Sequence, residues 1–81
     1  MAKYLIYGLS MCEYCALTCE YLSEREIEFV FMNMDEDPVG LTEAKAYYTH
    51  RTVPIILSSD TETGNVSFVG GYDDLVKGLE S

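Results

Sequence analysis

The stretch YLIYGLSMCEYC, residues 4–15, carries the strongest fold signal in the sequence. Residues 4–7 form a short apolar run of strand-favouring side chains, and the run stops at a glycine. A loop is expected over residues 8–11, followed by a helix whose apolar positions recur every three or four residues. Cys12 and Cys15 would therefore stand directly after a strand, in the first turn of a helix.

The rest of the sequence alternates between strand and helix signals. Thr42 is a candidate N-cap for the second helix, and the strand before that helix is expected to be buried on both faces. A polar turn over residues 58–64 separates the last two strands and predicts a hairpin. The predicted strands cover residues 4–7, 28–34, 54–57 and 65–69, and the predicted helices cover residues 12–26, 42–48 and 72–79.

This order, β-α-β-α-β-β-α, places the chain in the α/β class. The first two strands are joined by a helix and should lie parallel, whereas the two hairpin strands must be antiparallel. The simplest layered solution is a mixed four-stranded sheet with helices on both faces.

Size and charge narrow the range of functions. The 81 residues are expected to form a single domain, residues 1–81. A net charge of −9 with only five Lys and Arg residues argues against nucleic-acid binding, which needs clustered cations. No apolar run reaches the roughly 20 residues that cross a bilayer, and the start of the sequence lacks a secretory signal pattern. We therefore expect a cytoplasmic protein that does not bind membranes.

The three cysteines cluster between residues 12 and 19, which suits local chemistry rather than a secreted disulfide framework. The N-terminal turn of a helix offers unpaired backbone N–H groups and a partial positive charge, and both stabilise a thiolate. Because the thiolate is the attacking species, Cys12 is the expected nucleophile. Cys15, one turn further, is placed to resolve a mixed disulfide.

Two alternatives stand beside this interpretation. The cysteines could be inert structural residues, or they could belong to a zinc site completed by Cys19 and His50. A structural zinc ion needs four such ligands, and His50 lies far along the chain, so zinc is the weaker alternative. Cys19 shares the helical face of the pair, and a small buried hydrophobe is a better account of it than a redox or regulatory role.

Three segments in the expected order resemble the glutaredoxins, a branch of the thioredoxin fold. They are CEYC at residues 12–15, TVP at residues 52–54 and GGYDDL at residues 70–75. Their spacing is similar to that of small bacterial and phage dithiol glutaredoxins, and the resemblance covers essentially the whole chain. It departs from the family at Glu13, where a proline is common, and the loop before Cys12 lacks a basic residue.

The resemblance implies a redox-active pair, Cys12 and Cys15, beside a groove for glutathione. In the family, the proline of TVP is cis, and the residue before it pairs its backbone with glutathione. The glycine pair and the acidic helix start bind the γ-glutamyl end, and a basic residue before TVP meets the glycine carboxylate. The residues so implied are Tyr14, Arg51, Thr52, Val53, Pro54, Gly71, Tyr72 and Asp73.

The implied activity is glutathione-dependent thiol–disulfide exchange that reduces protein disulfides or glutathione mixed disulfides. Glutathione would be the reductant, no metal is expected, and ribonucleotide reductase is a natural client of a monomeric protein of this kind. One alternative is a redoxin of the same shape that thioredoxin reductase reduces, although GGYDDL favours glutathione. Another is a carrier that holds a [2Fe–2S] cluster, which Cys15 makes less favourable because it equips the site for dithiol exchange.

Overall fold

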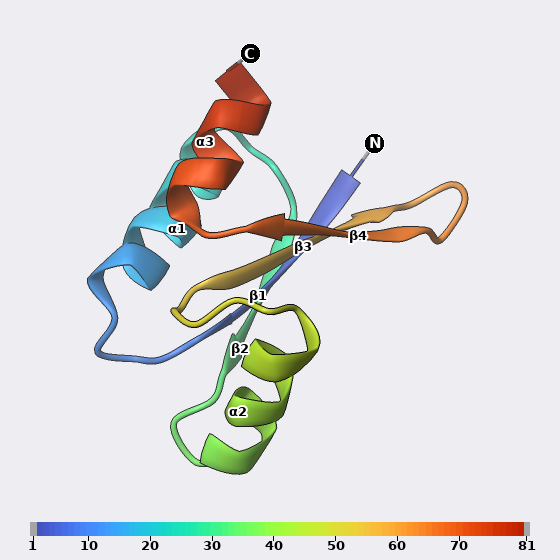
Figure 1. The fold of residues 1–81 in the computed structure, drawn as a ribbon. Coiled ribbons are helices and arrows are strands. Elements are labelled where there is room, and N and C mark those ends of the chain that lie inside the picture. Colours follow the sequence, from blue (N-terminus) through green and yellow to red (C-terminus); the bar gives the residue numbers. More distant parts are fainter. Residues whose placement is uncertain (1, 81) are drawn as a thin grey trace.

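The computed structural model describes residues 2–80, and within them the predicted order of strands and helices is confirmed. The elements follow one another as shown in Figure 1. They are β1 (Ala2–Gly8), α1 (Glu13–Glu24), β2 (Phe29–Asn33), α2 (Pro38–Tyr47), β3 (Ile55–Asp60), β4 (Val66–Gly70) and α3 (Tyr72–Glu80). Within the described residues, no helix has the length and apolar character needed to span a membrane.

The four strands form one mixed sheet in the order β2-β1-β3-β4. β1 runs parallel to β2 and antiparallel to β3, and β3 pairs antiparallel with β4. Helices α1 and α3 lie side by side on one face of the sheet, and α2 covers the other (Figure 1). The predicted thioredoxin-like layering is therefore confirmed.

Side chains that alternate along the central strands divide the core between the two faces. Ile6 and Ile56 are register partners on β1 and β3, and both are fully buried with Leu22 and Leu75 beneath α1 and α3. The neighbouring Ile55 faces the opposite way and packs under α2. This alternation of faces is the two-residue period of a strand.

The expectation that the second strand is buried on both faces is wrong. β2 lies at the edge of the sheet, and Val30 and Met32 remain 39% and 42% exposed. Phe29 and Phe31 point inward and pack against the core. A continuous apolar run therefore marked a strand correctly, but the run contains both an inner and an outer set of apolar side chains.

Helix α2 begins four residues earlier than predicted. Asp37 is its N-cap, and the Asp37 carboxylate accepts a hydrogen bond of 2.9 Å from the backbone N–H of Gly40. Pro38 follows in the first turn, where a residue without an N–H is tolerated. Thr42 lies inside the helix and its hydroxyl donates to the carbonyl of Pro38. The expectation that Thr42 is the N-cap is therefore wrong, and Pro38 starts the helix.

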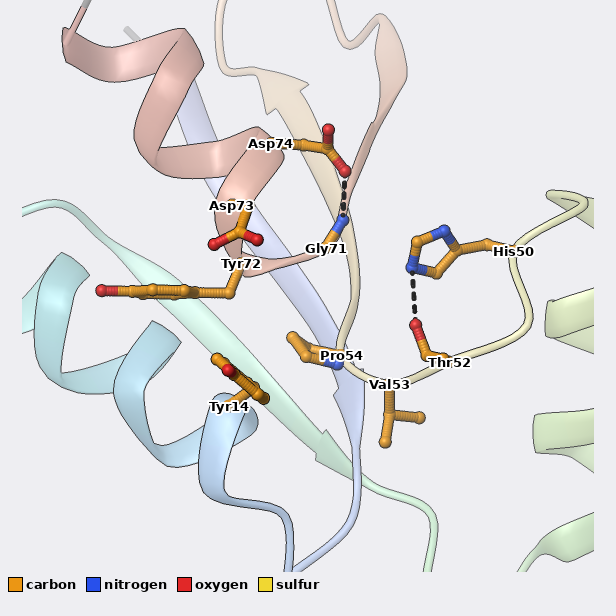
Figure 2. Close-up of a pocket in the computed structure, with 9 residues that line it drawn as sticks. All are labelled: Tyr14, His50, Thr52, Val53, Pro54, Gly71, Tyr72, Asp73 and Asp74. Atoms are coloured by element: carbon orange, nitrogen blue, oxygen red, sulfur yellow. Dashed lines mark hydrogen bonds between the residues drawn. The ribbon is translucent and has the colours of Figure 1, made fainter.

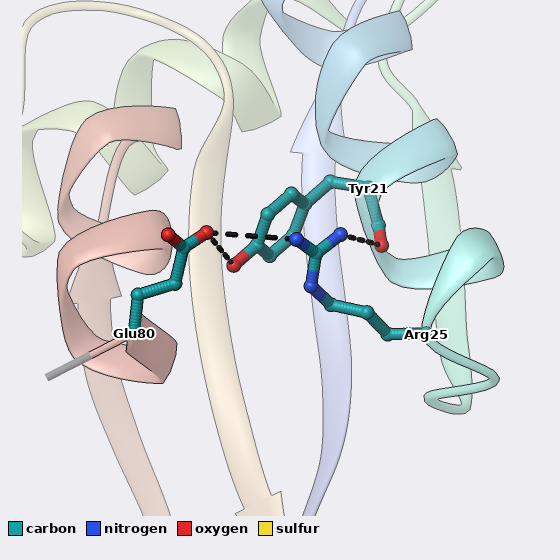
Figure 3. Close-up of polar contacts among 3 residues, drawn as sticks. All are labelled: Tyr21, Arg25 and Glu80. Carbon is teal, nitrogen blue, oxygen red and sulfur yellow. Dashed lines mark hydrogen bonds and ion pairs between the residues drawn. The ribbon is translucent and has the colours of Figure 1, made fainter.

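The end of α1 is fastened to the end of α3 by three side chains (Figure 3). The hydroxyl of Tyr21 donates a 2.8 Å hydrogen bond to Glu80, and the Arg25 guanidinium lies 3.5 Å from the centre of the Tyr21 ring. Arg25 also forms a 3.5 Å ion pair with Glu80. This clamp holds the end of α3 against the end of α1.

Candidate active site

Cys12 is the N-cap of α1, and its sulfur faces the first turn of the helix. The backbone N–H of Cys15 donates to Cys12 Sγ over 3.1 Å, so the sulfur occupies the place of a capping oxygen. Cys12 is half-buried, and its Sγ lies 3.9 Å from the carbonyl oxygen of Val53. A helix N-terminus with a direct N–H donor stabilises a negatively charged sulfur. The geometry thus suits Cys12 as the attacking cysteine.

Cys15 sits behind Cys12 and is 1% exposed. Burial, and after it the hydrogen bond with Cys12, raise the pKa of the Cys15 thiol to about 12. Cys15 is therefore a protonated thiol while the pair is reduced. The two cysteines have different environments, since Cys12 is half-buried at the helix start and Cys15 is fully buried behind it.

The loop before Cys12 is held by a contact that the sequence did not reveal. The carboxylate of Asp35 accepts a 3.0 Å hydrogen bond from the backbone N–H of Ser10 and a short one from the Ser10 hydroxyl. The hydroxyl contact is the main reason why the pKa of Asp35 lies below its usual range. Asp35 follows β2, so it ties the β2–α2 connection to the loop that presents Cys12.

A groove of about 440 Å³ opens beside the cysteine pair. It is formed by the start of α1, the segment before β3 and the start of α3 (Figure 2). Seven of the predicted binding residues meet here, although they come from three separate parts of the chain. The groove is lined by Tyr14, His50, Thr52, Val53, Pro54, Gly71, Tyr72, Asp73 and Asp74.

The backbone of the groove has the features that the sequence motifs implied. The Val53–Pro54 peptide bond is cis. Gly70 has φ of +123°, a conformation that side chains rarely adopt, and it ends β4 just before α3. The rings of Tyr14 and Tyr72 lie 5.9 Å apart between centroids, so the two helix starts approach each other through aromatic side chains.

Two residues of the groove were not predicted, and one has a signal that could have found it. Asp74 stands at the third position of α3, and its carboxylate accepts a 3.0 Å hydrogen bond from the backbone N–H of Gly71. This is the reciprocal half of a capping box, which the spacing of a helix start and an acidic residue can indicate. His50 was considered only as a zinc ligand, and no periodic pattern marks it.

Arg51 does not line the groove. It lies at an adjoining pocket of about 340 Å³ that shares His50 with the groove. The two residues are neighbours in an irregular segment, so the sequence could not indicate which of them faces the groove. Arg51 thus lies beside the groove, whose lining at this point is His50, and the expected contact of Arg51 with the glycine carboxylate of glutathione stays a prediction.

Cys19 lies one turn beyond Cys15 and is partly buried. It packs against the core under α1 and lines a narrow crevice of about 190 Å³ together with Cys12 and Cys15. Burial raises the pKa of the Cys19 thiol. These surroundings agree with the packing role expected for Cys19.

A thioredoxin-like sheet with a Cys-x-x-Cys pair at the first turn of α1 defines this protein as one built for thiol–disulfide exchange. The chain belongs to the glutaredoxin family, since the glutaredoxin family model matches residues 4–61, which is more than half of its length. The matched region contains the cysteine pair and the TVP segment, and it ends before β4 and α3.

Solved structures share the fold. A glutaredoxin from Brucella melitensis has a TM-score of 0.71 and 24% identity, with 99% of this chain and 80% of that chain covered. Glutaredoxin 1 from Francisella tularensis, solved with cacodylate, has a TM-score of 0.66 and 18% identity, covering 99% and 94%. A Plasmodium falciparum thioredoxin reaches 0.61 and 15%, covering 98% and 69%. Comparison with curated protein sequences gives no significant match.

Proposed function

We propose that this protein is a glutathione-dependent thiol–disulfide oxidoreductase that reduces protein disulfides or glutathione mixed disulfides. The observation that carries the proposal is the 3.9 Å approach of Cys12 Sγ to the carbonyl oxygen of Val53. This contact brings the sulfur of Cys12 next to Val53, which lines the groove, and the groove has the size and lining to suit a small peptide. We further propose a cytoplasmic, monomeric protein, with ribonucleotide reductase as one client.

Glutathione would lie along the groove with its cysteine at Cys12. The backbone of Val53 would pair with the cysteinyl backbone, as in an added strand. The γ-glutamyl carboxylate would meet the first N–H groups of α3, because a helix N-terminus favours anions. Asp73 would pair with the α-ammonium group, while Asp74 is already engaged with the backbone N–H of Gly71.

The exchange proceeds by two displacements at sulfur. The Cys12 thiolate attacks a client disulfide, forms a mixed disulfide and releases one client sulfur as a thiolate. Cys15 then attacks the Cys12 sulfur, and the second client sulfur leaves with the proton that Cys15 gives up. Two electrons pass from the cysteine pair to the client. Two molecules of glutathione then supply two electrons to reduce the Cys12–Cys15 disulfide, and they become glutathione disulfide.

A glutathione mixed disulfide needs only the first cysteine. Cys12 attacks the glutathione sulfur and the client leaves as a thiol. A second glutathione attacks the same sulfur, giving glutathione disulfide and the Cys12 thiolate. The proposal therefore expects Cys15→Ser to keep this activity and to lose the reduction of intramolecular protein disulfides.

The test is NADPH-coupled reduction of a glutathione mixed disulfide in the presence of glutathione and glutathione reductase. A parallel reaction replaces these two with thioredoxin reductase. We expect turnover in the first reaction, its abolition in Cys12→Ser, and near-normal turnover in Cys19→Ser, which makes the same substitution outside the pair. Turnover with thioredoxin reductase alone would contradict the proposal and indicate a redoxin of the alternative type.

A further inference from the structure

Three side chains that can carry positive charge meet around the pocket next to the groove. They are Lys45, His50 and Arg51, and the remaining lining residues are Ala46 and Thr49. We call these five residues the basic pocket. The chain has only five Lys and Arg residues and a net charge of −9, so a gathering of three such side chains stands out against an acidic molecule.

The end of α2 explains why these side chains converge. The backbone N–H of His50 donates to the carbonyl of Lys45 over 2.9 Å, and that of Thr49 donates to the carbonyl of Ala46 over 3.3 Å. Thr49 has φ of +53°, the left-handed conformation that ends many helices. This turn folds the chain back so that His50 and Arg51 come beside the last turn of α2.

The two permanent cations of the basic pocket, Lys45 and Arg51, have no ion-pair partner among the described residues. The ion pairs between described residues engage Lys3 and Arg25, and neither Lys45 nor Arg51 forms one with another described residue. A cation near a helix C-terminus interacts favourably with the helix dipole, and this accounts for Lys45 in the last turn of α2. Lys77 serves α3 in the same way. The dipole does not account for an open pocket lined by three such side chains.

The basic pocket is also close to the reacting sulfur. His50 lines both it and the groove. Arg51 precedes Val53 by two residues, which separates their Cα atoms by at most about 7 Å, and the Val53 carbonyl lies 3.9 Å from Cys12 Sγ. An extended client segment spans about 3.3 Å per residue. A carboxylate a few residues from the client cysteine can therefore reach the pocket while the cysteine reacts.

We propose that the basic pocket docks an acidic segment of the protein client, next to the disulfide that Cys12 attacks. This docking proposal rests on the proposed thiol–disulfide exchange, and it adds a feature by which the protein would select its clients. Aspartate or glutamate side chains flanking the client cysteine meet Lys45, His50 and Arg51, while the rest of the acidic surface repels such segments. The pocket thus selects both the client and the orientation in which it binds.

The test uses two synthetic peptides with one intramolecular disulfide each, identical except that one carries Asp and Glu where the other carries Asn and Gln. Fully reduced protein is mixed with each peptide in a single turnover, without glutathione. The peptide disulfide is reduced to two thiols as the Cys12–Cys15 disulfide forms. We expect the acidic peptide to react about tenfold faster, and raised salt to reduce this preference because it screens charges.

The decisive variant is Lys45→Glu, and its matched control is Lys77→Glu, since each residue is the basic residue in the last turn of its helix. Lys45→Glu should remove the preference for the acidic peptide, Lys45→Arg should keep it, and Lys77→Glu should leave it unchanged. Thermal unfolding of each variant reports any loss of folding. The turnover of a small glutathione mixed disulfide should stay within about twofold in Lys45→Glu.

Three results would overturn the docking proposal. They are equal rates for the two peptides in the unaltered protein, an equal loss with both peptides in Lys45→Glu, or an equal loss with the small glutathione disulfide. The last result would assign the basic pocket to a carboxylate of glutathione. Because the single turnover contains no glutathione, the docking proposal can survive even if thioredoxin reductase proves to be the electron source.

Discussion

Gly8 and Cys15 are packed so closely that a Cβ atom at Gly8 would lie 2.6 Å from Cys15 Sγ. The same Cβ would lie 2.9 Å from Phe31 Cε1, so the ring on β2 closes the other side. The end of β1 thus forms the wall against which the buried thiol rests. Glycine is needed at this position for space, since its backbone conformation is an ordinary one.

We predict that Gly8→Ala costs about 1–3 kcal/mol of stability, because the added methyl group displaces Cys15 or Phe31. Gly78→Ala is the matched control. A Cβ there meets nothing within 4 Å, and alanine in a helix is favoured over glycine by about 0.5–1 kcal/mol. Urea unfolding should move in opposite directions for the two variants, and an unchanged midpoint for Gly8→Ala would refute the contact.

The second prediction concerns thiol reactivity. With a pKa of about 12 for Cys15, raised mainly by burial, roughly one thiol in a thousand is ionised at about pH 9. In the folded protein we expect iodoacetamide to modify Cys12 first and Cys15 very slowly, with the Cys15 rate rising about tenfold per pH unit. Mass spectrometry of digested protein measures both sites, and protein unfolded in urea is the control. Equal rates in the folded protein would contradict the assignment.

A third prediction follows from Asp35 and Ser10. The folded-state pKa of Asp35 lies below its ordinary value of 3.8, chiefly because the Ser10 hydroxyl donates to it. The stability that it contributes is therefore present above about pH 3.8 and is lost as the pH falls through the lowered pKa. Asp35→Asn should lower the Tm at about pH 7, and the difference from the unaltered protein should shrink at lower pH.

The neighbouring carboxylate provides the control for this pH series. Glu36→Gln removes an exposed negative charge one residue away, and its effect on Tm should be small. If Asp35→Asn and Glu36→Gln gave the same profile, the contact with Ser10 would contribute nothing to stability.

The fourth prediction is a coupling between α1 and α3. Tyr21→Phe removes the donor to Glu80, and Glu80→Gln removes the charge that also attracts Arg25. Each variant should lower the Tm, and the losses should not add in the double variant because both disrupt one network. Thermal unfolding of the four proteins gives the coupling directly, and strictly additive losses would show that the clamp is not energetically linked.

The order of strands and helices could be predicted because each signal is local. Apolar runs, turn residues and the Cys-x-x-Cys position depend on neighbouring residues in the chain. Pro38 could not be placed from the same information, since proline both breaks helices and starts them, and the capping contact between Asp37 and Gly40 decides between these roles. The exposure of β2 depends on its place at the sheet edge, which no local pattern records.

Some residues of the candidate site could likewise be predicted from the sequence, and others could not. The motif residues Tyr14, Val53 and Asp73 meet in the groove as the resemblance implied. The sequence could not show which of His50 and Arg51 faces the groove, because the segment between α2 and β3 has no periodic pattern that assigns side chains to one side. The contacts between Gly8 and Cys15 and between Ser10 and Asp35 join distant parts of the chain, so only the folded molecule reveals them.

The layout of the chain has a practical consequence for building sensors. Ala2 and Leu79 line one pocket together with Arg25, at the end of α1 opposite Cys12. The 12 residues of α1 place about 18 Å between that end and the cysteine pair. A fluorescent reporter attached next to either residue would therefore lie far from the thiols. A protein tethered to an electrode at that end would keep Cys12 accessible to the solution.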